Sequence, residues 1–448
     1  MSLISRFSLV MLIAMLCLGL FVPASAQVPD PQPIAQAVID NLIAGNYEAA
    51  TADFTDEMLA ALPPAKLQQV WESVIDQVGP YQRQVEVTGQ TAEGYTVFIF
   101  TLQFENALLD AQISISTDGK VGGFYIRPNQ GPPPPPYEAP DYVNPDAFTE
   151  QDITLNAGTE WELPGTLSLP VGDGPFPAVV LVHGSGPEDR DETIGANKPF
   201  RDLAWGLATQ GIAVLRYDKR TLVYAQAMKD QIQSLTVQDE TIDDALAALE
   251  LLRSADKIDP ARVFLAGHSL GGYLAPRIAS QTSDLAGIII LSGNARPLDV
   301  LIVEQVKYLL SLKPEMSDAD RAQLESIEAD AEALKNLDAS TDPSTTYFGV
   351  PAVYWLDLKH YDPVATAQTL TLPMLILQGG RDYQVTMTDF KLWQDGLAGH
   401  DNVTFISYPT LNHLLISGED PSTPTEYNQP GHVASQLIQD VANWILQR

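Results

Sequence analysis

The chain has 448 residues, of which 45% are hydrophobic, enough for two domains with sizeable cores. It carries 57 acidic and only 25 basic residues, which gives a formal net charge of −32. Such a surface repels phosphate backbones and anionic membranes, so nucleic-acid binding and basic-patch lipid binding are excluded as leading functions.

The first 26 residues have the pattern of a secretory signal. Arg6 supplies a positive charge, residues 9–22 form an apolar stretch, and residues 24–26, Ala-Ser-Ala, form a cleavage site before Gln27. An uncleaved membrane anchor is the alternative, but the stretch is short for a span and no stop-transfer pattern follows it. We therefore expect a secreted or periplasmic protein that keeps no membrane segment after cleavage. Because the only cysteine, Cys17, lies in this segment, disulfides, a cysteine nucleophile and a thiolate metal site are excluded from the mature chain.

Residues 27–130 predict a small α+β domain. Its expected helices lie at 34–46 and 63–78, and its expected strands at 84–88, 95–104 and 111–116. The domain holds no histidine, and its acidic residues are expected to be solvated rather than catalytic.

A glycine and five consecutive prolines at 131–136 follow this domain. Stacked prolines can join neither a helix nor a sheet ladder, so residues 131–147 are expected to form a stiff, proline-rich linker.

Residues 148–448 predict an α/β domain, in which a hairpin is followed by continuous apolar runs. The hairpin is expected at 152–155 and 165–169, and the runs at 178–182, 212–216, 263–266, 287–291, 374–377 and 403–406. Such runs are typical of parallel strands that helices bury on both faces. Residues 296–362 are too long for an ordinary crossover, so we expect them to form a mostly helical insertion, with 13 acidic and 6 basic residues.

Residues 267–272, Gly-His-Ser-Leu-Gly-Gly, follow one of these strands and precede a helical stretch. A serine on a strained turn between strand and helix projects its hydroxyl above the sheet, and glycine neighbours let strand and helix approach each other. The motif in this context predicts Ser269 as a nucleophile. The alternative is an ordinary glycine-rich turn with a buried serine. Pro276 conflicts with the expected helix, because proline lacks the N–H that a helix interior needs.

A serine nucleophile needs a base, and His413 is the histidine best placed to be one. It lies in the loop after the last predicted strand, at the sheet edge where catalytic side chains are delivered. Asp382 follows the preceding strand and could orient the histidine, so that Ser269, Asp382 and His413 come in the chain order that this architecture uses. Asp218, at another strand end, is the rival acid. His268, beside Ser269, is expected to point away from it.

The turn at 183–186, His-Gly-Ser-Gly, ends the first predicted parallel strand. Its small residues let the backbone N–H of Ser185 aim at the same point as that of Leu270, which predicts an oxyanion hole. His183 is expected to brace the turn by a hydrogen bond to the backbone. Charged residues at 187–191 and 216–220 are expected to form structural salt bridges rather than substrate contacts.

From about residue 152 onward the chain resembles a serine α/β-hydrolase. The likeness is carried by His-Gly-Ser-Gly-Pro-Glu-Asp-Arg-Asp at 183–191, Asn-Lys-Pro-Phe at 197–200, Arg-Tyr-Asp-Lys-Arg at 216–220 and the motif at 267–272. Together these segments resemble those of bacterial carboxylesterases related to dienelactone hydrolases and acyl-CoA thioesterases.

This resemblance implies an α/β-hydrolase fold in which Ser269, Asp382 and His413 are the nucleophile, acid and base. It also implies that the insertion is a lid, where Tyr354 and Trp355 either line the acyl pocket or pack the lid itself. The first domain is similar to a small domain of unknown function, with a cone-like sheet, that often precedes such esterases.

The expected function is hydrolysis of short- to medium-chain carboxylic esters through an acyl-enzyme, with a small-molecule ester as substrate and no metal or cofactor. A thioesterase or a peptidase stays open, because the triad determines acyl transfer and not the leaving group. A non-catalytic binding protein on a hydrolase scaffold is the alternative from another class. The sequence leaves the oligomeric state unknown.

Overall fold

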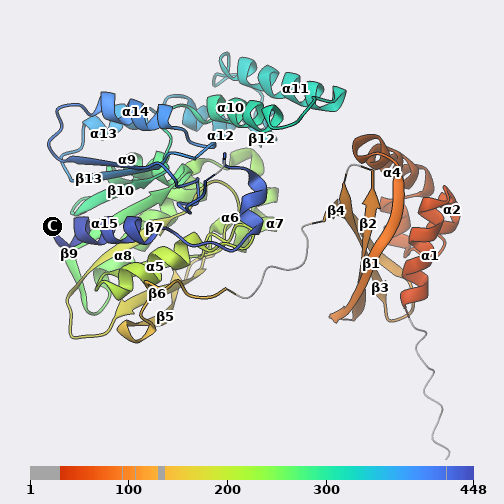
Figure 1. The fold of residues 1–448 in the computed structure, drawn as a ribbon, viewed down its shortest axis with the longest axis horizontal. Coiled ribbons are helices and arrows are strands. Elements are labelled where there is room, and N and C mark those ends of the chain that lie inside the picture. Colours follow the sequence, from red (N-terminus) through yellow and green to blue (C-terminus); the bar gives the residue numbers. More distant parts are fainter. Residues whose placement is uncertain (1–30, 93, 106, 130–136, 420) are drawn as a thin grey trace, which may run out of the picture. The chain divides into compact units, whose positions relative to one another are not determined.

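The computed structural model describes residues 31–448 except 93, 106, 130–136 and 420. The chain divides into two compact units, Met1–Gly131 and Pro132–Arg448 (Figure 1). The expected secretory signal at 1–26 and the prolines at 132–136 lie outside the described residues. Within the part of the chain that the structure describes, no helix is both long and apolar enough to cross a membrane.

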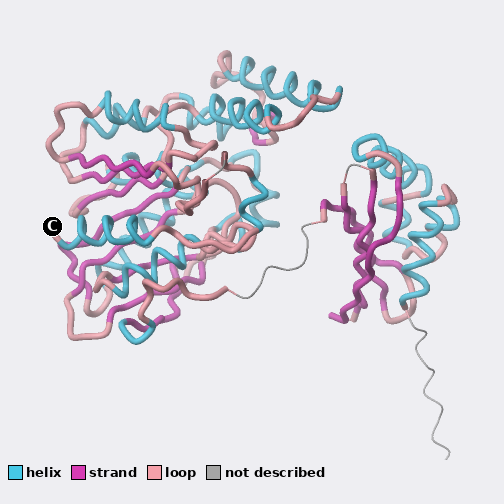
Figure 2. Tube along the Cα trace, viewed as in Figure 1, coloured by secondary structure: helices cyan, strands magenta, loops and turns pink. Residues whose placement is uncertain are grey.

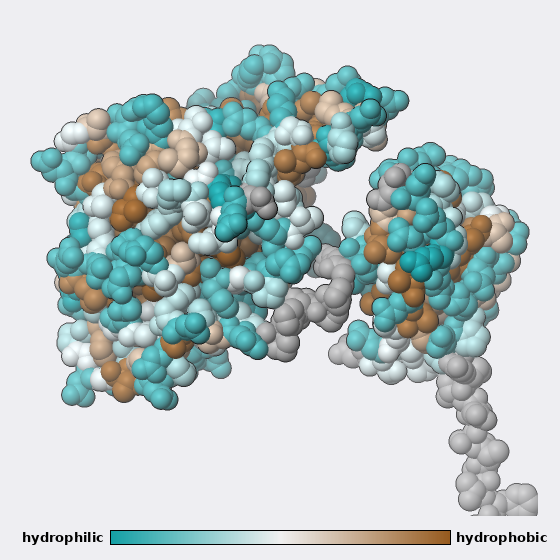
Figure 3. All heavy atoms as spheres, viewed as in Figure 1, coloured by the Kyte–Doolittle hydropathy of each residue, from teal (hydrophilic) through white to brown (hydrophobic). Residues whose placement is uncertain are grey.

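The first unit is an α+β domain, as predicted, in which helices precede an antiparallel sheet of order β1-β2-β3-β4. Its elements are α1 (Gln32–Ile43), α2 (Tyr47–Ala50), α3 (Asp56–Ala61), α4 (Pro64–Val78), β1 (Tyr81–Ala92), β2 (Tyr95–Phe104), β3 (Leu108–Ser116) and β4 (Val121–Pro128). Alternate residues of β2 from Phe98 to Phe104 are buried and share one core with Ile39 of α1 and Trp71 of α4. Hydrophobic side chains also show on the strands of this unit in Figure 3.

The second unit is built on a sheet of order β14-β13-β10-β9-β7-β8-β6-β5. Its strands are β5 (Phe148–Leu155), β6 (Leu163–Pro170), β7 (Phe176–Val182), β8 (Ala213–Tyr217), β9 (Ile258–His268), β10 (Gly287–Leu291), β13 (Met374–Gly379) and β14 (Val403–Tyr408). Neighbours from β8 to β14 are parallel, whereas β6 pairs antiparallel with both β8 and β5. The predicted hairpin and every predicted parallel strand are therefore present.

Helices cover both faces of this sheet (Figure 1). They are α5 (Pro199–Thr209), α8 (Asp243–Ser254), α9 (Leu270–Ala279), α13 (Pro363–Gln368), α14 (Met387–Gly396) and α15 (Ser435–Leu446). The short helices α6 (Arg220–Val223) and α7 (Ala225–Asp230) follow β8 at the ends of the strands (Figure 1), and further helical turns lie at Pro145–Ala147, Ile232–Ser234, Gln238–Ile242 and Pro424–Asn428. Side chains alternate along β7: Val179 and Leu181 pack with α5 and α15, whereas Val180 and Val182 pack with α8 and α9. A largely parallel sheet between two helical layers confirms the predicted α/β-hydrolase fold.

The segment at 296–362 contains α10 (Leu298–Ser311), α11 (Asp318–Leu334) and α12 (Ala352–Lys359), and also a small hairpin of β11 (Thr346–Tyr347) and β12 (Val350–Pro351) that the sequence did not predict. At the start of α11, the side chains of Ser317 and Asp320 each accept the other's backbone N–H, which fixes where the helix begins. Leu334 and Trp355 belong to a small core of this segment, separate from the cores of the sheet. The helices α10 and α11 lie at one corner of the unit, and much of their surface is hydrophilic (Figures 2 and 3).

Residues 137–147, the later part of the predicted linker, belong to the second unit. The hydroxyl of Tyr137 donates a hydrogen bond to Asp202 of α5 at 2.5 Å, and its ring packs edge-on against Trp205. This end of the linker is therefore fastened to the second unit by an aromatic side chain.

Candidate active site

The carboxyl ends of the parallel strands bring the predicted site residues to one edge of the sheet. Ser185 follows β7, Ser269 follows β9, Asp382 follows β13 and His413 follows β14. In an open parallel sheet this is the edge at which ligands bind.

Ser269 occupies a sharp turn between β9, which ends at His268, and α9, which begins at Leu270. Its backbone has φ 51° and ψ −115°, a conformation that residues with a side chain rarely adopt. A Cβ on Gly267 would lie 2.2 Å from the carbonyl oxygen of Gly271, and one on Gly271 would lie 2.3 Å from that of Val182. The glycines therefore allow the close packing of strand and helix that raises Ser269 above the sheet.

The helix that follows this turn continues through Pro276 to Ala279, although the sequence marked the proline as a conflict. The α9 residues from Leu270 to Pro276 are all buried, and helix and sheet share one core. Tertiary packing thus outweighs the local cost of the proline.

Asp382 and His413 are in direct contact, with 2.8 Å between Oδ2 of the carboxylate and Nδ1 of the imidazole. The other oxygen, Oδ1, accepts the backbone N–H groups of Gln384 and Val385 at 2.8 and 2.9 Å, and Gln378 donates to Oδ2 at 3.1 Å. The side chains of the pair are 0% and 5% exposed, respectively. A carboxylate surrounded by donors holds the proton of His413 on Nδ1 and leaves Nε2 available as a base.

The rival acid, Asp218, is paired with Arg190 and not with His413. Both of its carboxylate oxygens accept hydrogen bonds from the guanidinium of Arg190, at 2.8 and 2.9 Å. Arg216 is buried and pairs with Asp191, so the two charged segments are joined by structural salt bridges, as predicted. His183 also has its predicted bracing contact, because its Nε2 lies 3.0 Å from the carbonyl oxygen of Asp189.

Ser269, Ser185 and Leu270 line one cavity of ≈ 540 Å³. The apolar part of its lining includes Leu298, Leu301, Ile302, Val350, Tyr354 and Trp355 from the insertion. The volume falls within the roughly 300–1,000 Å³ typical of small-molecule sites. The Oγ of Ser269 and the backbone N–H of Ser185 have no hydrogen-bond partner in the described part of the chain, and the N–H of Leu270 lies at the start of α9, where N–H groups lack an intrahelical acceptor.

The structure does not join Ser269 to His413 by a hydrogen bond, although it brings both to the same edge of the sheet. Contacts of this kind are often long in a free enzyme and tighten when substrate binds.

Tyr354 and Trp355 lie in α12 and are almost fully buried. The hydroxyl of Tyr354 donates to Glu240 at 2.7 Å, and the ammonium of Lys219 binds the other oxygen of the same carboxylate. Burial and the charge of Glu240 raise the pKa of Tyr354, so its hydroxyl stays protonated. The indole N–H of Trp355 donates to the carbonyl of Tyr347 at 2.9 Å, so Trp355 both packs the insertion and lines the cavity.

One residue near the site had no signal in the sequence. The carboxylate of Glu192 accepts the backbone N–H of Gly184 at 2.8 Å and lies 2.9 Å from Nδ1 of His268. The ring of His268 contacts Glu192 and the His413 carbonyl, and among the described residues no hydrogen bond joins it to Ser269. A buried histidine at a strand end needs a polar partner, but only the fold shows that Glu192 is that partner.

Left-handed backbone conformations gather around this site. The described non-glycine residues with positive φ are Asn156, Glu192, Lys257, Ser269, Asp284, Ser292, Phe348 and Leu415. Glu192, Ser269, Ser292 and Leu415 lie in loops at the active edge of the sheet, and Phe348 lines the cavity. The described residues contain no cluster of three or more acidic, histidine or cysteine side chains that could hold a metal ion.

Two family models match the chain. Residues 35–124 match a protein family of unknown function, DUF3887, and residues 174–420 match the family described as serine aminopeptidase, S33. Esterase EstD of Thermotoga maritima is 39% identical over 410 residues, which covers 91% of this chain and 94% of that protein.

Several solved structures are also similar to the chain. An esterase of Pyrococcus furiosus matches 70% of this chain and 96% of its own with 16% identity and a TM-score of 0.43. Est1E from Butyrivibrio proteoclasticus matches 66% of this chain and 99% of its own with 14% identity and a TM-score of 0.43. Because one family model spans more than half of the residues and EstD aligns along nearly the whole length, the chain belongs to the serine aminopeptidase S33 family and is a serine hydrolase of the α/β-hydrolase fold.

Proposed function

We propose that the protein is a carboxylic ester hydrolase in which Ser269, Asp382 and His413 form the catalytic triad. One observation carries the proposal: the buried Asp382 holds Nδ1 of His413 at the same sheet edge where Ser269 stands on a strained turn beside an apolar cavity. The relative EstD is an esterase, which favours an ester as the substrate.

The reaction follows from these positions. His413 Nε2 takes the proton of Ser269, whose Oγ attacks the ester carbonyl carbon. The backbone N–H groups of Ser185 and Leu270 stabilise the oxyanion, and each such donor lowers the barrier by roughly 3 kcal/mol. His413 then gives its proton to the leaving alcohol, and afterwards activates a water that hydrolyses the acyl-enzyme.

The cavity lacks the charge that an aminopeptidase needs. Such an enzyme has to bind the free ammonium group of its substrate, which requires an available carboxylate. Glu240 is the acidic residue among the described residues that line the cavity; its charge is already compensated by the buried ammonium of Lys219, and its other oxygen accepts from Tyr354. This arrangement favours a neutral ester over a free peptide N-terminus.

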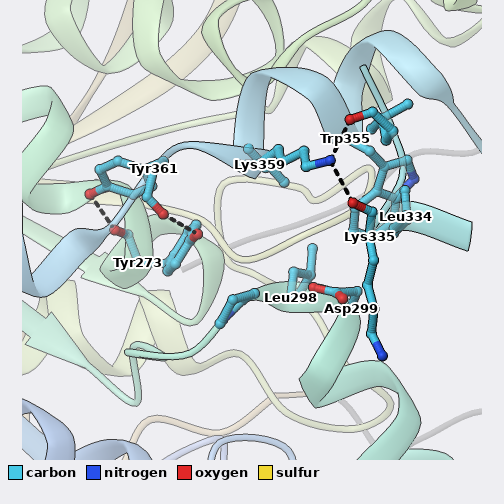
Figure 4. A pocket seen from close by; sticks show the side chains of 11 residues that line it. Tyr273, Leu298, Asp299, Leu334, Lys335, Trp355, Lys359 and Tyr361 are labelled. Carbon is cyan, nitrogen blue, oxygen red and sulfur yellow. Dashed lines mark hydrogen bonds between the residues drawn. The ribbon is translucent and has the colours of Figure 1, made fainter. Parts of the chain in front are cut away.

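A wall formed by Trp355 and Leu298 limits the acyl chain. Both residues line the main cavity, and both also line a second, smaller cavity of ≈ 180 Å³ (Figure 4). The small cavity lies within the insertion, where Tyr361 and Lys359 line it, and reaches Tyr273 of α9; the ammonium of Lys359 donates to the carbonyl of Lys335 at 3.0 Å. Closed by this wall, the main cavity suits acyl chains from acetyl to about hexanoyl.

A panel of chromogenic esters of increasing acyl length tests this function, with a thioester and a peptide anilide measured beside them. We expect kcat/KM to be highest for the short and medium esters. A higher kcat/KM for the thioester or the anilide would assign a different leaving group to the same triad.

Replacing Trp355 with alanine is expected to lengthen the preferred acyl chain, because loss of the indole joins the two cavities. The kcat for a short ester should stay within about tenfold of the original value, since the reacting groups are untouched. Truncation of a buried tryptophan typically costs about 3–5 kcal/mol of stability, so Trp355→Leu serves as a milder second variant.

Leu356→Ala is the matched control for this experiment. Leu356 packs against the same small core of the insertion but lines neither cavity. Its truncation should leave the chain-length preference unchanged. Equal losses on every ester in the Trp355 variants would mean that the residue only packs the insertion.

The proposal also includes export of the protein from the cytoplasm. The charged start, apolar stretch and cleavage site in residues 1–26 favour a secreted or periplasmic protein that is free of the membrane after cleavage. N-terminal sequencing of the protein from the producing cells should find Gln27 as the first residue.

A further inference from the structure

A buried pair beside the site, Glu192 and His268, joins three of the loops that carry the proposed catalytic groups. Glu192 Oε1 accepts the N–H of Gly184, the residue before Ser185. Glu192 Oε2 lies 2.9 Å from Nδ1 of His268, the residue before Ser269. His268 Nε2 lies 2.8 Å from the backbone carbonyl oxygen of His413.

These contacts determine the protonation state of His268. A backbone carbonyl can only accept a hydrogen bond, and an ionised carboxylate can only accept one as well. Nε2 of His268 therefore has to donate to the His413 carbonyl. Nδ1 and Glu192 Oε2 are at ion-pair distance without being aligned as a hydrogen bond, and the negative charge of the carboxylate favours a proton on Nδ1 as well, so the ring is an imidazolium paired with Glu192. The side chains of the pair are 4% and 2% exposed, so both contacts are shielded from bulk solvent.

The charges around His268 support this state. Burial by itself would lower the pKa of His268, but the charge of Glu192, the contact with it and the His413 carbonyl raise that pKa to about 9. The same interactions outweigh burial at Glu192 and lower the pKa of its carboxyl. The charges of Glu188 and Asp382 also interact with the His268 ring. The centroid of the His413 ring lies 4.7 Å from that of His268.

The backbone conformation of Glu192 also indicates that the surrounding contacts constrain this position. Its φ of 52° is left-handed, where a glutamate is rarely found. Residues persist in such conformations when surrounding contacts hold them there, and these conformations gather at functional sites.

We propose that Glu192 and His268 are positioning residues, an ion pair that holds the turn bearing the Ser185 N–H, the Ser269 elbow and the His413 loop in register for catalysis. This inference rests on the proposed function, because it assigns the pair a role in that reaction. Neither residue touches the reacting atoms. Both act through the backbone of the groups that do.

The pair has a defined pH window. The folded pKa of His268, about 9, is above the ordinary 6.5, so its contribution to stability is complete below pH 6.5 and is lost as the pH rises through 9. The folded pKa of Glu192 is below 4.5, so its contribution is complete above pH 4.5 and is lost on further acidification. Above pH 9 the ring keeps one proton and has to release either Glu192 or the His413 carbonyl, so kcat should decline there.

Two substitutions at Glu192 separate positioning from simple packing. In Glu192→Gln, the amide oxygen can still accept from Gly184 while its N–H donates to Nδ1 of a neutral His268, which keeps Nε2–H on the His413 carbonyl. We expect kcat at neutral pH to stay within about tenfold and the alkaline decline near pH 9 to disappear. In Glu192→Ala all of these contacts are lost, and kcat should fall on the order of 10²-fold with little change in KM.

Asp244→Asn is the matched control, because Asp244 also forms a buried ion pair, with Arg220 at 2.6 Å, but contacts none of the three loops. It should lower Tm and leave kcat and the pH profile as they are. The inference is overturned if both Glu192 variants lower Tm but keep the kcat and pH profile of the original protein, as the Asp244 variant should.

A second measurement tests the pair without any enzymatic activity. In Ser269→Ala protein labelled with ¹⁵N-histidine, both ring nitrogens of His268 should be protonated at pH 7 and one should lose its proton near pH 9. A neutral ring at pH 7 would overturn the inference. Because this readout needs no turnover, it stands even if the triad assignment fails, and residual hydrolysis by the same variant would count against the proposed function alone.

Discussion

Replacing Ser269 with alanine is expected to abolish ester hydrolysis and to leave the fold intact. Without Oγ no acyl-enzyme forms, and loss of the nucleophile in a serine hydrolase lowers kcat on the order of 10⁶-fold. The hydroxyl has no partner among the described residues, so its removal leaves no buried group unpaired. Alanine also has to adopt the same positive φ, so the free energy of unfolding should change by less than about 1 kcal/mol.

An active-site phosphonate gives the decisive measurement for this variant. It should label the original protein at Ser269 and fail to label Ser269→Ala, while Ser280→Ala stays labelled because Ser280 caps the opposite end of α9. Denaturant unfolding of the same samples shows that the fold is unchanged. Labelling of another serine in Ser269→Ala protein would refute the assignment.

Replacing Asp382 with asparagine should lower kcat on the order of 10⁴-fold. The amide oxygen can keep the N–H groups of Gln384 and Val385, but the amide nitrogen then faces Nδ1 of His413. The imidazole has to move its proton to Nε2, where it can no longer take the proton of Ser269. His413→Ala should be equally disabled, because no base remains.

Asp218→Asn is the control for the acid. The substitution breaks the ion pair with Arg190, in which the side chains of Arg190 and Asp218 are 24% and 17% exposed. It should lower stability without a large loss of kcat. Measured kcat/KM for a short ester, with Tm for each variant, distinguishes the two carboxylates. If Asp218→Asn were inactive and Asp382→Asn stayed active, Asp218 would be the catalytic acid instead.

The central parallel strands β7, β8, β10 and β13 of the second unit could be read from sequence because each is buried on both faces. Residues 287–291 were predicted as a strand and form β10 with the same bounds, since a short continuous run rich in β-branched isoleucine is typical of a strand covered on both faces. In contrast, β4 was missed because Gly122 and Gly123 interrupt its pattern and resemble a turn. The β11–β12 hairpin was missed because each of its strands has only two residues.

The candidate site was predictable where local geometry depends on residue type. The glycines around Ser269 are required by sterics, so the turn is visible in the sequence. The partner of His268 is different, because Glu192 is far away along the chain and no spacing or periodicity relates the two residues. Only the packing of the β7, β9 and β14 loops brings them together.

The left-handed residues at the active edge have a consequence for how this protein could adapt to heat. Glycine tolerates positive φ without strain, so a glycine at Glu192, Ser269 or Leu415 would relieve a conformation that costs about 1–3 kcal/mol. Ser269 is the proposed nucleophile, Leu415 lies in the loop of His413, and Glu192 holds the backbone of the turn before Ser185. Selection for heat tolerance alone would therefore favour substitutions at these positions that abolish activity. Substitutions that raise stability and keep activity have to lie away from the site, for example on the exposed surface of α11.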